Sequence, residues 1–236
     1  MKLKILYIAV LFLVFFQSVQ AQNKMQAEVT IQQLIRNKVL TIKKEIFYQS
    51  NGHLVTHITQ PQEIIIISNS LGEISSYFPA TDEAFSSVSP SQSSKNEVFA
   101  VFSSNERNDL GLSSLGFEMK QQERDSTRIV KTYIPTTENK EISRIIMVYD
   151  NDLPIYCGYF NKENKENKKI YYQDYIHLPK FSMPTNITEI SVMPSNDTII
   201  RRQIFSSVKC DKEAVSEYFE FRIPDSAKMM EGIKIE

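Results

Sequence analysis

Apolar and polar residues alternate with a period of two along most of the chain, downstream of an apolar N-terminal segment. Residues 39–48 show the pattern, with Leu40, Ile42 and Ile46 on one parity and Lys44 interrupting it. Successive side chains of a β-strand point to opposite faces, so this alternation is typical of a half-buried strand. The same criterion predicts strands at 53–58, 63–67, 73–78, 117–122, 128–134, 142–149, 153–160, 169–175, 188–193, 198–206 and 218–223.

Turn signals separate these segments. Asn51-Gly52 lies between two alternating runs and predicts a tight hairpin, because the favoured two-residue turn needs positive φ at both central residues. The stretch Ile64–Ile67 is apolar on both parities, which indicates a strand covered on both faces. About a dozen short strands at regular spacing are typical of an all-β domain.

Two segments depart from this regular pattern. Residues 86–94 are rich in serine and predict a connector; behind it, Asn96 is placed to cap a short helix, within an apolar insert near 96–114. At Thr30, the spacing to Gln33 matches a capping box and favours a short helix, although the alternation there also fits a strand.

The start of the chain has the three-part layout of a secretory signal. Lys2 and Lys4 precede an apolar run at 5–16, and residues 17–21 end in small side chains, with cleavage expected after Ala21. The run is shorter than the ~20 apolar residues that span a bilayer, and no cysteine follows it for lipid attachment. We therefore expect a signal peptide at 1–21 and a single exported, periplasmic β domain at 22–236 that does not span the membrane.

Catalytic motifs are missing from the sequence. It contains no P-loop, no Gly-x-Gly-x-x-Gly, no Gly-x-Ser-x-Gly and no His-Glu-x-x-His. His53 and His57 would lie roughly 13 Å apart on a strand, too far for one metal ion. Asp150 and Asp152 flank a turn, where aspartate is favoured for its local hydrogen bonds. We expect no enzyme, no cofactor and no metal site.

Neither the net charge nor the two cysteines point to a particular partner. The net charge of −1 gives no general affinity for nucleic acid or for anionic membranes. Cys157 and Cys210 are the two cysteines, and an exported chain can either bridge them or keep them as thiols.

The order of motifs resembles the LolA/LolB-like superfamily of outer-membrane lipoprotein carriers. The opening Thr59-Gln60-Pro61, the central Leu115-Gly116-Phe117 and the closing Phe219–Pro224 follow the family pattern, and the likeness covers nearly all of residues 22–236. The resemblance implies a mainly β fold: a strongly bent antiparallel sheet, or incomplete β-barrel, with a lid of short helices packed on its concave side. Classical carriers carry an arginine just before Thr-Gln-Pro, and we align Val55 with that position.

The resemblance implies an apolar concavity that binds the acyl chains of lipid or lipoprotein. Apolar contact stabilises a buried acyl chain by ~0.8 kcal/mol per CH₂. We expect a monomer acting as a carrier; the alternatives are that these residues form an ordinary filled core, or that the fold serves as an envelope sensor that binds a protein partner. The predicted lining of the groove and its cover is Leu40, Ile42, Ile46, Leu54, Ile58, Ile64, Ile66, Ile74, Phe99, Phe102 and Leu112.

Overall fold

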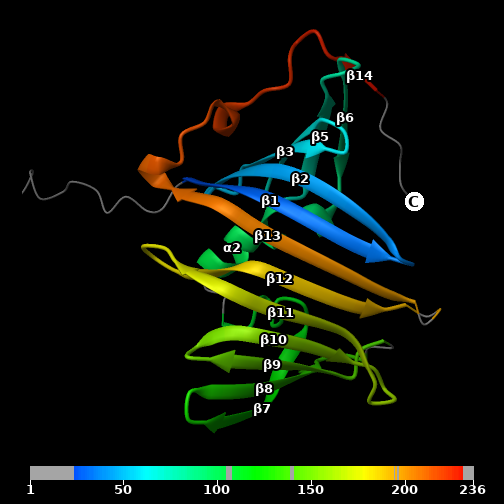
Figure 1. Ribbon diagram of the computed structural model, residues 1–236, viewed down its shortest axis with the longest axis vertical. Coiled ribbons are helices and arrows are strands. Elements are labelled where there is room, and N and C mark those ends of the chain that lie inside the picture. Colours follow the sequence, from blue (N-terminus) through cyan, green and yellow to red (C-terminus); the bar gives the residue numbers. More distant parts are fainter. Residues whose placement is uncertain (1–23, 105–107, 139–140, 194, 196, 231–236) are drawn as a thin grey trace, which may run out of the picture.

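A computed structural model describes residues 24–104, 108–138, 141–193, 195 and 197–230 (Figure 1). The signal peptide expected at 1–21 lies outside these residues. Within them the chain forms one strongly bent, unclosed sheet with the order β14-β6-β5-β4-β3-β2-β1-β13-β12-β11-β10-β9-β8-β7. The first seven strands along the chain are β1 Lys24–Ile35, β2 Lys38–Gln49, β3 Leu54–Gln60, β4 Ile64–Ser68, β5 Glu73–Phe78, β6 Glu83–Val88 and β7 Phe117–Asp125. The others are β8 Arg128–Pro135, β9 Arg144–Asp150, β10 Leu153–Phe160, β11 Glu166–His177, β12 Ser182–Val192, β13 Thr198–Cys210 and β14 Lys228–Met229.

Neighbouring strands pair antiparallel, except that β14 runs parallel to β6. The predicted fold class, a bent antiparallel sheet of incomplete-barrel type with a few short helices, is therefore confirmed. Register shifts between β1 and β13, β2 and β3, β7 and β8, and β9 and β10 mark β-bulges, which bend a strand and increase its twist. These bulges account for part of the curvature that gives the sheet a concave side.

The N-terminal segment is a strand, so the short helix favoured at Thr30 was wrong. β1 lies in the middle of the sheet between β2 and β13, and its alternate residues Ala27, Val29 and Ile31 are buried. The alternation decided the structure because a central strand has all its backbone groups paired on both sides. The capping-box spacing was coincidental.

A short helical segment covers the inner face of the sheet, as predicted (Figure 1). The 3-10 turns η1 Pro90–Gln92 and η2 Ser94–Asn96 lead into α2, Val98–Ser103. Glu97, not Asn96, caps this helix, and its carboxylate accepts a hydrogen bond from the Val98 N–H at 3.1 Å. The serine-rich segment begins as strand β6, because Ser86 and Ser87 pair with β5.

The C-terminal segment covers the opposite, outer face of strands β2 to β6. It contains the 3-10 turns η4 Asp211–Glu213 and η5 Glu217–Glu220, so the strand predicted at 218–223 was wrong. Phe219 packs there with Phe47, Val55 and Ile65 in a second apolar core. In the described chain residues 218–223 belong to no paired strand, and their apolar side chains hold them against the sheet instead.

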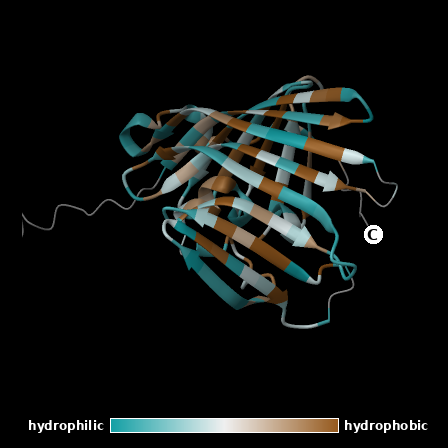
Figure 2. Cartoon of the chain, turned by 60° about the horizontal axis from the view of Figure 1, so that its bottom comes forward, coloured by the Kyte–Doolittle hydropathy of each residue, from teal (hydrophilic) through white to brown (hydrophobic). Residues whose placement is uncertain are grey.

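Turn chemistry matches the sequence at two hairpins, with one difference. At β9–β10, Asn151 and Asp152 both have positive φ, as a two-residue turn requires. At β2–β3, Gly52 has a positive φ of +89°, whereas the φ of Asn51 is not positive. The Asn51 Oδ1 instead accepts a hydrogen bond from the His53 N–H at 2.9 Å. Glycine is required at position 52, because a Cβ there would lie 2.9 Å from the Ser70 Cβ. Figure 2 shows the alternating apolar and polar bands along the strands.

Candidate functional site

Strand register places the predicted lining of β2 to β5 on the inner face, the face that carries α2. Residues directly opposite one another on paired strands share a face. One such row runs through Ile46, Thr56 and Ile66 and continues to Phe85, and the next pairs Ile58 with Ile64. The parity assigned from the sequence is therefore the parity in the structure.

Part of the predicted set is brought together in a closed core. Ile46 and Leu54 are buried in one cluster with the residues expected to cover them, and Ile42 packs against its margin. Phe99 contacts Phe205 with ring centroids 6.0 Å apart, and it is fully buried. The covering residues in this cluster are Phe99, Phe102 and Leu112.

The remaining predicted residues lie on the same face but outside that core. Ile58, Ile64 and Ile66 are half-buried, and they belong to neither apolar core of the described chain. Ile74 is buried one strand further on, whereas Leu40 is 50 % exposed at the far end of β2. The inner face of β3 and β4 is therefore an apolar strip that solvent partly reaches.

Sequence reasoning missed aromatic residues on both halves of the inner face. Phe78 and Phe85 stack with centroids 5.8 Å apart beside the strip of β3 and β4. In the second half, Tyr133, Tyr149 and Tyr172 are buried under the lid. The period-two pattern of β8 and β9 contained this signal, because Tyr133 shares its parity with buried Ile129, and Tyr149 shares its parity with buried Ile145 and Met147.

The buried tyrosines and Cys157 are not poised for chemistry. Burial raises the pKa of the Tyr149 and Tyr172 hydroxyls, and it raises the pKa of the Cys157 thiol to about 12. The Tyr149 hydroxyl donates to the carbonyl of Asn108. A thiol that stays protonated at neutral pH is a poor nucleophile, so these groups serve packing and hydrogen bonding.

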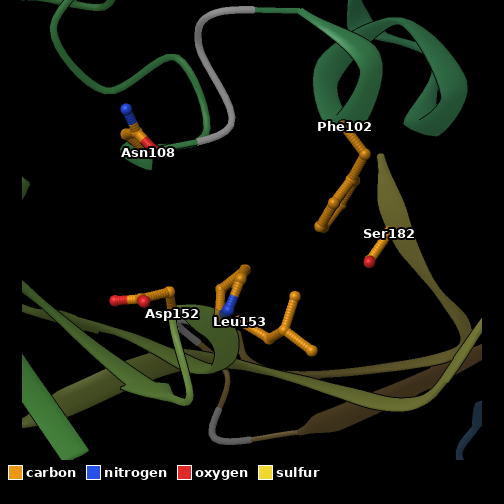
Figure 3. A pocket seen from close by; sticks show the side chains of 6 residues that line it. Phe102, Asn108, Asp152, Leu153 and Ser182 are labelled. Carbon is orange, nitrogen blue, oxygen red and sulfur yellow. The ribbon is translucent and has the colours of Figure 1, made fainter. Parts of the chain in front are cut away.

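A cavity of about 210 Å³ opens beside the lid (Figure 3). This volume is below the 300–1,000 Å³ typical of small-molecule sites, and the space between α2 and the sheet is filled by the buried side chains of Phe99, Ala100 and Phe102. A long acyl chain fits the inner face only if the lid shifts. The cavity is lined by Phe102, Asn108, Asp152, Leu153, Pro154 and Ser182.

The lid is held at its N-terminal end by polar contacts to the sheet. Glu97 forms an ion pair with Lys44 at 3.8 Å, and their side chains are 13 % and 14 % exposed. The Ser94 hydroxyl donates to the Gly52 carbonyl at 2.6 Å, and the Ser93 hydroxyl donates to the Ser70 carbonyl at 2.9 Å. The β2–β3 and β4–β5 turns therefore anchor the start of the lid.

Val55, the residue aligned with the arginine of classical carriers, faces away from the lid. It is fully buried in the outer core with Phe47 and Phe219. A side chain at this position cannot reach α2, and its neighbours Leu54 and Thr56 occupy the inner face. The ion pair between the sheet and the lid is instead formed by Lys44 of β2 and Glu97.

The other polar candidates have structural roles. His57 faces outward, stacks on Tyr218 with centroids 4.7 Å apart and contacts Glu63 at 2.9 Å. Asn186, part of a glycosylation sequon, is buried, accepts from Arg202 at 3.0 Å and donates to Asp174 at 3.0 Å. Cys157 and Cys210 are not bonded to each other.

Neither a metal site nor a membrane-spanning helix is found in the part of the chain that the structure describes. No group of three or more histidine, cysteine, aspartate or glutamate side chains in it is arranged to hold a metal ion. None of its helices is long and apolar enough to cross a bilayer.

The bent sheet with its inner lid defines the class of LolA-like folds, and solved structures show this likeness directly. A LolA superfamily protein from Nitrosomonas europaea aligns with a TM-score of 0.53 at 11 % identity, covering 84 % of this chain and 92 % of that one. A putative outer-membrane lipoprotein-sorting domain from Vibrio parahaemolyticus gives 0.52 at 12 %, covering 84 % and 89 %. A DUF1329-family protein from Desulfovibrio piger gives 0.53 at 15 %, covering 87 % and 93 %.

Sequence comparisons add no closer relative. No protein-family model matches the chain, and no curated protein matches it significantly. At these low identities the structural likeness establishes the fold and leaves the function to the residues of this chain.

Proposed function

We propose that this protein is a periplasmic carrier that reversibly binds the acyl chains of lipids or lipoproteins against the inner face of its sheet. The observation that carries the proposal is the apolar strip of β3 and β4, formed by Ile58, Ile64 and Ile66 beside a lid of six residues. Binding needs no covalent chemistry, in keeping with the buried, protonated thiol and phenols. Outer-membrane lipoprotein sorting is the process in which a carrier of this kind would act.

The energetics favour an acyl chain over a smaller ligand. Each methylene removed from water contributes ~0.8 kcal/mol, so the binding of an acyl chain laid along the strip becomes stronger as the acyl chain lengthens. Displacing α2 exposes Phe99 and Phe102, at a cost of about 1.5–3 kcal/mol for each side chain transferred to water. A chain that replaces these aromatic contacts recovers that cost, and a short ligand does not.

Paired substitutions on opposite faces test the proposal. Ile66 lies on the inner face of β4 and Ile190 on the outer face of β12, and both side chains are half-buried. We expect Ile66→Ser to weaken the binding of an apolar fluorescent dye and its displacement by fatty acid, because a hydroxyl replaces apolar lining. Ile190→Ser is the matched control and should leave binding unchanged. Equal effects of the two substitutions would count against the inner face as the site.

The filled space under the lid favours a second candidate, an envelope sensor that binds a protein partner. Phe99 and Phe102 already occupy the space between α2 and the sheet, and a partner could use the surface without entering the core. Affinity capture that returns one stoichiometric envelope protein while the inner face stays empty would favour this alternative.

A further inference from the structure

Exposed apolar side chains gather where two hairpins meet at one end of the sheet. Val39 is 65 % exposed and Leu40 is 50 % exposed, next to the β1–β2 turn, and Met193 on the neighbouring β12–β13 turn is 42 % exposed. The two hairpins lie side by side, because β1 pairs with β13 and the Arg36 guanidinium forms an ion pair with Asp197 at 2.8 Å (Figure 1). We use the name sheet tip for this surface. It consists of the apolar residues and the exposed cations beside them: Val39, Leu40, Met193, Lys38, Lys43, Arg201 and Arg202.

The apolar surface extends from the tip along the outer face. Val39 is opposite Leu34, Leu34 is opposite Ile200, and Ile200 is opposite Ile190. Strands lie about 4.8 Å apart, so this row spans four strands over roughly 14 Å. Apart from exposed Val39, its members are half-buried, and the C-terminal segment that covers the outer face packs elsewhere, on Phe47 and Val55.

The same end of the sheet is basic, although the chain as a whole carries a net charge of −1. Two carboxylates beside the tip are already paired, Asp197 with Arg36 and Glu189 with Lys168 at 3.1 Å. Within the described residues, no ion pair involves the exposed cations of the tip and the strands beside it. These cations are Lys38, Lys43, Arg201 and Arg202.

We propose that the sheet tip docks on an anionic phospholipid bilayer, with Val39 and Leu40 inserted at the interface and the surrounding cations on the headgroups. Apolar side chains exposed within a rim of lysine and arginine have the composition of an interfacial membrane anchor. Each lysine or arginine near an anionic surface contributes about 1 kcal/mol of attraction, which corresponds to about fivefold in affinity. Docking of this kind goes beyond acyl-chain binding, since it brings the inner face to the membrane.

Vesicle flotation tests the tip directly. The probes are vesicles of phosphatidylcholine alone and vesicles of phosphatidylcholine and phosphatidylglycerol in equal parts. The protein is the chain as an exporting bacterial host processes it, with its N-terminus fixed by mass spectrometry and identical in every variant. We expect flotation with the anionic vesicles, and its loss as ionic strength rises from about 0.01 M to about 1 M and the screening length falls from ~30 Å to ~3 Å.

Matched variants separate the tip from other exposed apolar residues. We expect Val39→Ser with Leu40→Ser to weaken binding about tenfold, through lost apolar burial. Lys38→Gln with Arg201→Gln should weaken it about fivefold per cation. The control is Leu71→Ser with Val88→Ser, which removes a leucine and a valine that are 69 % and 71 % exposed elsewhere, and it should bind as the parent does.

Three outcomes would overturn the proposal. These are no flotation with anionic vesicles at low salt, tip variants that float as well as the parent, and a concentration-dependent dimer that Val39→Ser disperses, which would make the tip a contact between copies. Dye binding at the inner face is measured on Val39→Ser alone, whose residue lies on the outer face, and should not change. If the parent protein does not bind the dye, the carrier function alone is contradicted. If it does not float with the anionic vesicles, the docking alone is contradicted.

Discussion

Phe99 is a fully buried residue of the apolar core on the inner face. It belongs to the lid helix α2, is buried against the sheet and contacts Phe205. Replacing it by alanine should lower the free energy of unfolding by about 3–5 kcal/mol, the usual cost of removing a buried phenylalanine. The same change opens space where an acyl chain would lie, so we expect tighter binding of an apolar dye by the folded variant.

Urea denaturation and dye titration on one preparation of Phe99→Ala check both expectations. Leu115→Ala removes a side chain that is 70 % exposed and should change stability by no more than about 0.5 kcal/mol. A stable Phe99→Ala variant would show that the lid is not packed as described.

Ionisation of the Cys157 thiol makes the free energy of unfolding depend on pH in the alkaline range. Burial raises the pKa of its thiol from the ordinary 9.0 to about 12, so the folded state favours the neutral thiol. This contribution is fully present below about pH 9 and is lost as the pH rises towards 12. Buried Tyr149 and Tyr172 act in the same direction, since burial raises their pKa values as well.

We therefore expect the free energy of unfolding to fall steadily above about pH 9, and to fall less steeply in Cys157→Ala. Urea titrations across the alkaline range measure both slopes. Parallel slopes in the parent and the variant would mean that the thiol is accessible to solvent in the folded protein.

Individual inner-face residues were predictable because their parity follows from a period of two. Ile46, Leu54 and Ile66 were assigned to the correct face from the sequence alone. What alternation cannot give is the depth of each residue in a bent sheet. Leu40 shares the parity of Ile46 but lies at an exposed strand end, while Ile58 and Ile64 lie beyond the lid.

At the scale of elements, the C-terminal segment is the clearest departure from the sequence prediction. Its aromatic residues alternate like a strand, yet they form a 3-10 turn that clamps the outer face. Phe219 meets Phe47 edge to face at 5.6 Å, Tyr218 stacks on Phe47 at 5.1 Å, and Gln49 Nε2 donates to the Phe219 carbonyl at 2.8 Å. No local pattern specifies this packing, because it depends on strands more than a hundred residues away.

We expect Phe219→Ala to lower the free energy of unfolding by about 3–5 kcal/mol and to release the segment from β2 and β3. Val215→Ala, at a residue 79 % exposed in the same segment, is the control and should be near neutral. Hydrogen exchange should show faster exchange at Val55 and Phe47 in Phe219→Ala. Unchanged protection there would mean that the outer core does not depend on the clamp.

The lid shows a different limit of prediction. An apolar helix near residue 98 was evident from Phe99 and Phe102, and so was its place on the concave side. Its anchor was not evident, because Lys44 and Glu97 are distant in sequence and meet only through the bend of the sheet. Lys44, which appeared to be a defect in an alternating strand, has its polar partner on the lid.

At the scale of the whole molecule, an unclosed sheet of fourteen described strands has two apolar faces to cover. The C-terminal segment covers one end of the outer face, and α2 covers part of the inner face. On each face some apolar surface is left uncovered, and we call these two surfaces the outer and the inner remainder. The inner remainder is the proposed acyl-chain site, and the outer remainder leads to the proposed membrane-docking tip. Eleven of the fourteen described strands were predicted from the sequence, which did not predict β1, β6 and β14 as strands, and the bent-sheet class was predicted from the resemblance. The surfaces left uncovered could not be predicted, because they depend on three-dimensional packing.

Native mass spectrometry of the protein, purified gently from its own host, tests the carrier function most directly. The account predicts one co-purified lipid or acylated peptide per chain, displaced by fatty acid and retained less well by Ile66→Ser than by Ile190→Ser. A chain that carries no lipid and shows no displacement of an apolar dye would contradict it.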